Sequence, residues 1–221
     1  MKSYYQISQP ILHGSFYGEL KNRFLAAVRV NNERIECYIP SSARLENFIS
    51  LENRRVLLVP TQSPKARTAY SVLAVKIARH NVLLNTSLAN RAMFHYLHFN
   101  KNTLFGTHSS IQAEKSVDGY KADIFVESQG RKCIIEIKSV LSLDHAGVFP
   151  TVFSERANKQ LSQLCDLLDR YAVEYSFVAI NPKMDSIRIN SEQKEYHTLF
   201  SRCVEKGMIF KAYSCVLKGK E

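Results

Sequence analysis

The hydrophobic pattern of this chain changes near residue 83, and that change constrains the fold more than any other feature. Before it, short apolar runs typical of β-strands follow one another without a helical segment, at residues 23–30, 34–39, 54–60 and 69–77. Asn31-Asn32 separates the first two runs and fits a hairpin turn, because Asn tolerates a positive φ. So many short strands within one segment favour a small closed barrel. We therefore predict a β-barrel domain over residues 1–82.

Helix-like and strand-like segments alternate after this point. We expect a helix at 87–97 with Ser87 as its cap, because apolar residues recur there at helical spacing. Two strand-like runs follow, at 120–126 and 132–138, joined by a turn at Gln129-Gly130. The other expected segments are helices at 154–171 and 192–206, and strands at 175–180 and 208–217. This order predicts a mixed α/β domain with a crossover connection over residues 83–221.

Positive charge is concentrated in the first half of the chain. Residues 1–100 contain 13 Lys and Arg against 5 Asp and Glu, a net charge of +8, whereas residues 101–221 contain 17 against 15, a net charge of +2. A small basic barrel favours an oligonucleotide-binding (OB) fold that contacts a polyanion, and ordinary solubilising charge is the alternative.

Aromatic residues interleave with basic ones in the barrel segment, where they serve either as stacking platforms for bases or as core. The aromatic set is Tyr4, Tyr5, Phe16, Tyr17, Phe24, Tyr38, Phe48 and Tyr70, and the basic set is Arg23, Arg29, Arg44, Arg54, Arg55, Lys65 and Arg67. From the basic set we take Arg23, Arg44, Lys65 and Arg67 as candidate nucleic-acid contacts.

Charged residues interrupt two otherwise apolar strands in the second half. Glu136 and Lys138 are two residues apart, so their side chains share one face of an extended strand, and Asp123 lies in the preceding run. Burying an unpaired charge costs several kcal/mol, roughly, so such residues need a partner. A metal or phosphate partner gives a nuclease-type site, whereas the alternative is a buried ion pair that braces the sheet.

Several of these residues and motifs resemble those of known protein families. Asp123 with Glu136-Ile137-Lys138 is similar to the PD-(D/E)XK nuclease superfamily, and most of the chain resembles the sugar fermentation stimulation protein A family. The residues that carry the second resemblance are Arg23-Phe24-Leu25-Ala26, Asn85-Thr86-Ser87-Leu88-Ala89-Asn90, Glu114, Ile135–Val140, Phe149-Pro150 and Glu155-Arg156. The resemblance implies an N-terminal OB barrel, a nuclease-like α/β domain and DNA binding with little sequence preference. In bacteria it also implies a link to the regulation of sugar, particularly maltose, metabolism.

Three departures from the family pattern affect its nucleic-acid contacts. Pro40-Ser41-Ser42-Ala43-Arg44-Leu45 lacks the glycine and the amide of the usual Pro-Asn-Thr-Gly-x-Met. Lys121 replaces an arginine, and Arg156-Ala157-Asn158-Lys159-Gln160-Leu161 lacks the family's histidine. The acidic residues of the site are retained.

The retained residues predict metal-dependent chemistry. Phosphodiester hydrolysis needs charge neutralisation and a hydroxide near neutral pH, and a hard cation such as Mg²⁺ or Mn²⁺ supplies both. Asp123 and Glu136 are the predicted ligands, and the Ile137 carbonyl is a further candidate. Lys138 would hold the attacking water or meet developing negative charge.

Three residues are candidates around this centre. Glu114 is either a third acid, as an outer ligand or a water-positioning group, or a solvated surface charge. Arg156 either grips phosphate or forms a surface salt bridge. Lys121 is a candidate nucleic-acid contact.

Two functions remain open from the sequence. The first is a Mg²⁺-dependent nuclease, and the second is a non-catalytic DNA-binding regulator of sugar metabolism that keeps the fold. DNA, single-stranded or double-stranded, is the expected partner in both, and RNA is not excluded. No run of 18 apolar residues and no apolar secretory stretch occurs, so we expect a cytoplasmic protein without a membrane partner.

Overall fold

The first half of the chain folds into the predicted barrel. The computed structural model describes residues 5–41, 44–61, 63, 65–100, 102–103, 106–107 and 110–218, so that Tyr4 and the Ser42-Ala43 pair lie outside the described residues. The barrel strands are β1 (Leu12–Glu19), β2 (Leu25–Val30), β3 (Glu33–Tyr38), β4 (Arg55–Pro60) and β5 (Tyr70–Ile77). Antiparallel pairs join them in the order β3-β2-β1-β4-β5, and a parallel pairing of β3 with β5 closes the barrel.

Local sequence accounts for the hairpin at the edge of the barrel. Asn31 and Asn32 have φ values of 48° and 67°, so both central residues of the β2–β3 turn lie in the left-handed region that Asn tolerates. Alternate residues of the strands point inward, and the barrel interior is filled by aliphatic side chains such as Val28, Val56 and Val72, which have no exposed surface. The predicted hairpin and the predicted barrel are confirmed.

Three elements of the first half were not predicted. These are β1, whose apolar residues are interrupted by Gly14, Ser15 and Gly18, β6 (His80–Leu83), which pairs with β5, and a 3₁₀ turn, η1 (Leu45–Asn47).

Helix α1 (Thr86–Phe99) connects the barrel to the second half. Its cap is Asn85, whose side chain accepts a hydrogen bond from the Leu88 N–H, so the prediction that Ser87 is the cap was wrong. Ser87 lies inside the first turn, and its hydroxyl donates to Asn85 Oδ1 at 2.7 Å. Both residue types favour helix starts, and the residue that holds the extended backbone conformation takes the role.

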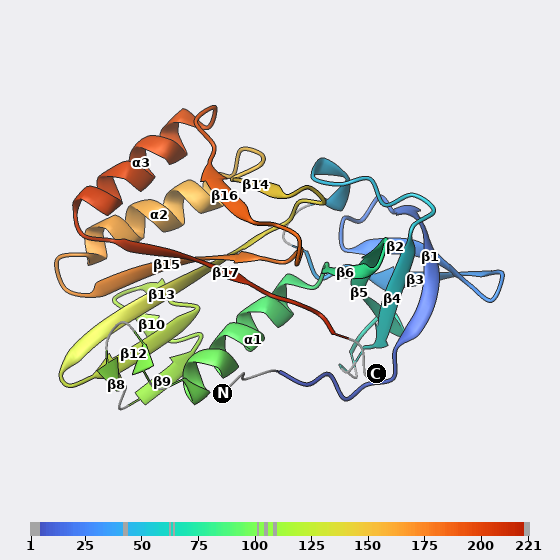
Figure 1. Ribbon diagram of the computed structural model, residues 1–221, viewed down its shortest axis with the longest axis horizontal. Helices are drawn as coiled ribbons and strands as arrows, with labels where there is room; N and C mark the ends of the chain where they lie inside the picture. Colours follow the sequence, from blue (N-terminus) through green and yellow to red (C-terminus); the bar gives the residue numbers. More distant parts are fainter. Residues whose placement is uncertain are drawn as a thin grey trace.

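A five-stranded sheet forms the centre of the second half. Its strands are β9 (Ser110–Ala113), β12 (Ile124–Ser128), β13 (Arg131–Val140), β15 (Ala172–Ala179) and β17 (Ile209–Ser214). They lie in the order β17-β15-β13-β12-β9 across the sheet. Parallel crossovers through α2 (Glu155–Leu167) and α3 (Lys194–Glu205) join β13 to β15 and β15 to β17. The mixed α/β class and the alternation predicted from the sequence are therefore confirmed (Figure 1).

Short two-stranded sheets accompany this central sheet. They are β7 (Asn102–Thr103) with β8 (Gly106–Thr107), β10 (Ser116–Val117) with β11 (Tyr120–Lys121), and β14 (Ala146–Phe149) with β16 (Ser186–Ile189). The run predicted as one strand over 120–126 is divided between β11 and β12, because the chain leaves the ladder at Ala122 and Asp123. The helix predicted to reach Tyr171 ends at Leu167, followed by a turn.

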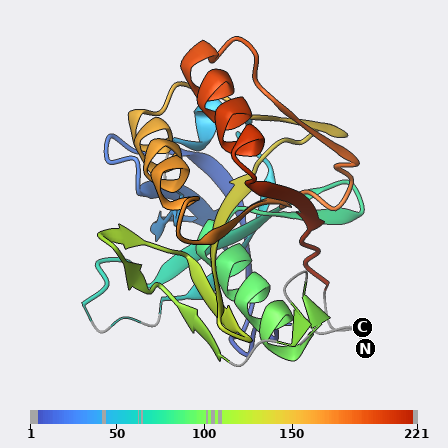
Figure 2. The ribbon, with the colours of Figure 1, turned by 90° about the vertical axis from the view of Figure 1, so that its left-hand side faces the viewer.

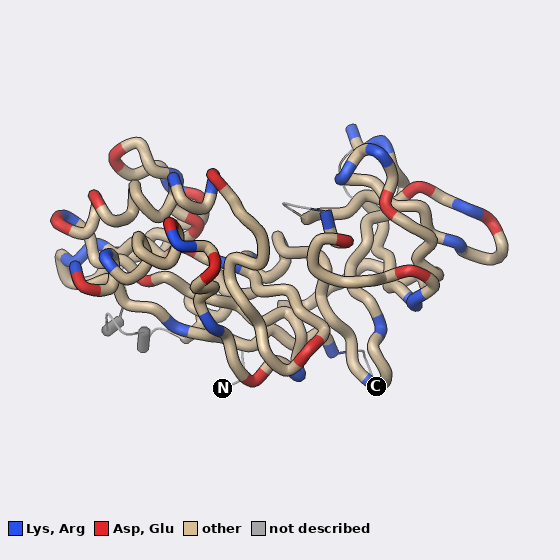
Figure 3. The backbone as a smooth tube through the Cα atoms, turned by 90° about the horizontal axis from the view of Figure 1, so that it is seen from above, with Lys and Arg blue, Asp and Glu red and all other residues tan. Residues whose placement is uncertain are grey.

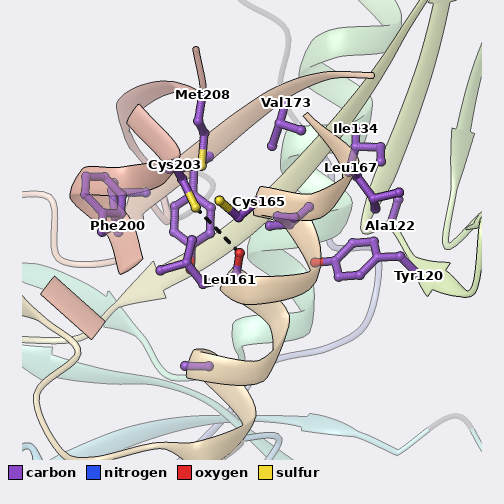
Figure 4. Packing of buried hydrophobic residues seen from close by; sticks show 14 of the residues in the cluster. Tyr120, Ala122, Ile134, Leu161, Cys165, Leu167, Val173, Phe200, Cys203 and Met208 are labelled. Carbon is purple, nitrogen blue, oxygen red and sulfur yellow. Dashed lines mark hydrogen bonds between the residues drawn. The ribbon is translucent and has the colours of Figure 1, made fainter. Parts of the chain in front are cut away.

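Both faces of the sheet are buried. Helices α2 and α3 cover one face, and α1 with the barrel covers the other (Figure 2). The α2–α3 side contains a cluster that includes Leu161, Phe200 and Cys203 (Figure 4). On the other side, Leu73 of the barrel and Met93 of α1 belong to the same apolar cluster as Ile135 of the sheet. Barrel and sheet therefore share one core. No described helix is long and apolar enough to cross a membrane.

Candidate active site

The break between β11 and β12 places Asp123 against β13. β12 begins at Ile124, which pairs with Ile135, so the part of β13 beyond Ile135 has no β12 partner. The Asp123 carboxylate takes that place, because its Oδ2 accepts the Ile137 N–H at 2.8 Å. In a strand, the N–H and C=O of one residue point to the same edge, so the Ile137 carbonyl also points toward the Asp123 side.

Glu136 and Lys138 lie on the α2 face of β13, as their spacing predicts. Lys138 Nζ is 2.6 Å from Glu136 Oε1 and donates to Gln160 Oε1 of α2 at 2.9 Å. The Tyr120 hydroxyl donates to Glu136 Oε2 at 2.5 Å, and Figure 4 shows Tyr120 reaching toward α2. Glu136 is only 2% exposed. Both of its oxygens thus have protein partners beneath the surface of the site.

Burial and the nearby negative charge raise the pKa values of Asp123 and Tyr120. Burial, followed by the nearby Glu136 charge, raises the pKa of Asp123 to about 6, although the Ile137 N–H, Lys138 and Arg156 oppose the rise. Burial, followed by the Glu136 charge, also raises the pKa of Tyr120 far above its ordinary value. Tyr120 is therefore a neutral donor at physiological pH. A carboxyl whose pKa lies near neutrality is typical of functional sites.

Asp123 lines a cavity of about 290 Å³. The cavity is lined by Glu114, Gly119, Tyr120, Lys121, Ala122, Asp123, Arg156, Gln160 and Gln163. Glu114 and Lys121 form an exposed ion pair at 2.7 Å, and the hydrogen bond from Lys121 lowers the pKa of Glu114. The structure therefore brings seven predicted residues into one region, namely Asp123, Glu136, Ile137, Lys138, Glu114, Lys121 and Arg156. Glu114 lies at the exposed side of this region.

The donor set fits a hard divalent cation in type. Asp123 and Glu136 provide carboxylate oxygens and Ile137 a carbonyl, and Mg²⁺ is usually held by one or two carboxylates with water and phosphate oxygens. Within the described ranges, no group of three or more His, Cys, Asp or Glu side chains is placed to hold a metal. A cation here would therefore have two acidic side chains available, those of Asp123 and Glu136, with the remaining positions left to other oxygens.

The predicted barrel contacts lie in a different part of the molecule. Arg67 lines a second cavity, of about 380 Å³, together with the stacked rings of Phe24 and Tyr38. The Arg23 guanidinium lies 4.7 Å from the centre of the Phe24 ring. Lys65 is exposed in the loop that contributes to this cavity.

Arg44 has a structural role that its sequence position did not indicate. Its guanidinium donates to the carbonyls of Leu20 and Lys21 at 3.3 and 2.8 Å, and forms an ion pair with Glu46 at 3.3 Å. These bonds hold the β1–β2 loop against the segment before η1.

Three residues that position the predicted site were not identified as functional from the sequence. Asn90 of α1 donates to Asp123 Oδ1 at 3.2 Å, Tyr120 donates to Glu136, and Gln160 accepts from Lys138. Asn90 occurs in a string that resembles the family, and Gln160 is the residue that replaces the family's histidine. These two strings could have indicated that Asn90 and Gln160 are functional. Nothing in the sequence around Tyr120, beyond its strand-like pattern, indicated a role for that residue.

Fold and site together define a class of protein: an OB barrel followed by an α/β domain with two carboxylates and a lysine where β13 runs past its neighbour. The profile described as "SfsA N-terminal OB domain" matches residues 20–84, and the profile described as "Sugar fermentation stimulation protein RE domain" matches residues 84–221. The chain belongs to the sugar fermentation stimulation protein family.

Individual relatives are distant but match along almost the whole chain. The sugar fermentation stimulation protein homolog of Pelagibacter ubique is 24% identical over 98% of this chain and 94% of its own length. The homolog of Desulforamulus reducens is 26% identical over 95% of this chain and 88% of its own length. The structure of Pyrococcus furiosus SfsA in complex with Ca²⁺ has the same fold, with a TM-score of 0.83, 18% identity and coverage of 97% of this chain and 92% of that chain.

Proposed function

We propose that this protein binds DNA and cleaves its phosphodiester bonds with the help of Mg²⁺ or Mn²⁺. The observation that carries the proposal is the position of Asp123, whose carboxylate is fixed on the Ile137 N–H beside Glu136 and Lys138. Pyrococcus furiosus SfsA, a protein of the same fold, has a structure in complex with Ca²⁺, which supports divalent-cation binding in the proposal.

Each residue of the site has a chemical task in this proposal. Asp123, Glu136 and the Ile137 carbonyl would hold the cation. When bound, the cation would neutralise phosphate charge and lower the pKa of a water molecule. Lys138, held in place by Gln160, presents its ammonium on the face where a nucleophilic water would be oriented or negative charge would develop. Arg156 lines the cavity beside Asp123 and would contact a substrate phosphate.

In this proposal, the barrel binds the DNA strand. Figure 3 shows Lys and Arg distributed over the barrel half of the molecule. Arg67 and the Phe24 and Tyr38 rings line the cavity of about 380 Å³, and the Arg23 guanidinium lies against the Phe24 ring, so that bases would stack and phosphates would be neutralised here. Arg44 is expected to contribute less, because its guanidinium already holds two backbone carbonyls.

A cleavage assay tests the proposal. Purified protein is incubated with single-stranded and duplex DNA in Mg²⁺, Mn²⁺ or a chelator. We expect cleavage that needs the metal and that falls at least about 100-fold in Glu136→Gln, with DNA binding retained, because the variant loses a metal ligand. Glu205→Gln, which changes an exposed residue at the end of α3, is the matched control and should cleave normally.

A non-catalytic regulator is the second candidate function. The burial of Glu136 favours it, because both of its oxygens already accept hydrogen bonds, from the Tyr120 hydroxyl and the Lys138 ammonium, and a metal would compete with these donors. In this case the protein would bind DNA in the cytoplasm and influence the expression of genes for sugar use, as the family name suggests. DNA binding by a wild-type protein that cleaves nothing in any metal would decide for this candidate.

A further inference from the structure

Three basic residues form one row across the outside of the barrel. In the strand registers, Arg34 of β3 pairs with Arg29 of β2, Arg29 pairs with Ser15 of β1, and Ser15 pairs with Arg55 of β4. Directly paired residues point to the same face, and the three arginines are exposed. We call Arg29, Arg34 and Arg55 the arginine row. It crosses three strand spacings, roughly 14 Å in all.

A bulge in β1 adds an aromatic ring to this row. Phe16 pairs with Val28 and Gly18 with Ala27, so Tyr17 is the extra residue between them. Bulges redirect side chains, and Tyr17 lies beside both neighbouring arginines. The guanidinium carbon of Arg34 is 4.4 Å from the ring centre and that of Arg29 is 5.9 Å from it.

The row has no internal counter-charge. Like charges directly opposed on neighbouring strands are destabilising. Among the described residues, the ion pairs include neither Arg29, Arg34 nor Arg55. Glu36 follows two residues after Arg34 on β3 and does not pair with it within 4.0 Å. An external anion would relieve the repulsion, and the row's length suits an extended polyanion better than a single small ion.

We infer that the arginine row is a contact site for the phosphodiester backbone of nucleic acid, separate from both cavities described above. This inference rests on the proposed DNA binding. Guanidinium groups recognise phosphate oxygens through paired N–H donors, and the Tyr17 ring holds two of them side by side. The row would read no sequence, because such contacts involve the backbone alone.

The salt dependence of DNA binding tests the row. Neutralising two phosphate contacts lowers the slope of log affinity against log salt by about 1.8 for duplex DNA. We therefore expect this reduction for Arg29→Gln with Arg34→Gln, measured from about 50 to about 200 mM salt. The control pair Arg131→Gln with Lys132→Gln removes the same charge at the exposed β12–β13 hairpin, remote from the barrel, and should keep the wild-type slope (Figure 1).

Two further variants keep the test decisive. Arg55→Gln lies away from Tyr17 and should lower the slope by about 0.9, even if the double variant fails to fold. Arg29→Lys with Arg34→Lys keeps the charge and should keep the slope. Wild-type slopes in both Arg29→Gln/Arg34→Gln and Arg55→Gln would overturn the inference. If the wild-type protein binds no DNA at all, the proposed function fails instead, and the two failures are thereby distinguished.

Discussion

At the scale of single residues, the site is a compact set of charged side chains in which burial raises the pKa of Asp123. Asp123 replaces a strand partner of Ile137, Glu136 lies under Tyr120, and Lys138 is held by Gln160. The period-two spacing of Glu136 and Lys138, together with Asp123 in the preceding run, predicted that these residues lie near one another. In the structure Glu136 contacts Lys138, and Asp123 accepts the N–H of the residue between them. Their partners Asn90, Tyr120 and Gln160 come from other elements, so only the tertiary structure identifies them.

The raised pKa of Asp123 predicts that this residue costs stability at neutral pH. The folded state binds the Asp123 proton up to pH about 6, whereas the unfolded state releases it near 3.8. The contribution of Asp123 is therefore most favourable below pH about 4, falls as pH rises to about 6, and then stays low. With a chelator present, Asp123→Asn should be more stable than wild type at pH about 8, by on the order of 2 kcal/mol, and should lose this advantage near pH about 4.

Urea unfolding at several pH values measures this difference. Asp166→Asn, which changes an exposed residue of α2, serves as the matched control and should not reproduce the gain in stability at pH about 8. An Asp123→Asn variant that is less stable than wild type at every pH would contradict the raised pKa.

Tyr120 should matter for both stability and the site. Tyr120→Phe removes the only hydroxyl that donates to Glu136 Oε2 among the described residues and leaves a buried acceptor, which costs about 1–3 kcal/mol. Tyr171→Phe is the matched control, because the Tyr171 hydroxyl bonds to Asp118 at an exposed position, and its effect should be smaller. Equal losses of unfolding free energy in the two variants would contradict the prediction that the buried Tyr120 bond stabilises the fold more than the exposed Tyr171 bond.

At the scale of secondary-structure elements, the sequence pattern predicted most of the long, regular segments and missed the short ones together with the eight-residue strand β1. The β2–β3 hairpin, β13, α2, α3 and β15 follow from periodicity and from turn residues such as Asn31-Asn32 and Gln129-Gly130. The β14–β16 ribbon was missed because its strands are four residues each and largely not buried. The break at Asp123 was missed because Ile124 and Tyr120 fit one continuous strand, and only the bond to Ile137 explains the departure.

The start of α1 gives a prediction at this scale. Because the Asn85 side chain accepts from the Leu88 N–H, Asn85→Ala should lower the free energy of unfolding by about 1 kcal/mol. Ser87→Ala, within the first turn, should cost less, because Ser87 only supports Asn85 by one exposed hydrogen bond. Denaturant unfolding of the two variants compares them. A larger loss of unfolding free energy in Ser87→Ala than in Asn85→Ala would contradict the assignment of Asn85 as the cap.

At the scale of the whole molecule, the barrel and the α/β sheet are joined by a common core. Leu73, Met93 and Ile135 come from the barrel, α1 and the sheet and pack in one cluster. Asn90 of the same α1 helix donates to Asp123, so the element that joins the two halves also contacts the site. The sequence predicted two units and a basic first half, but it contained no signal for this shared packing, which depends on contacts between distant segments.

The claim on which the account depends is that Asp123 and Glu136 hold a divalent cation. Crystals grown with and without Mn²⁺ would test it through the anomalous scattering of the metal. We expect one manganese peak within coordinating distance of the Asp123 and Glu136 carboxylates, with the Tyr120 or Lys138 contact to Glu136 displaced. Binding of Mn²⁺ elsewhere only, with both carboxylates still in the contacts described above, would contradict the account.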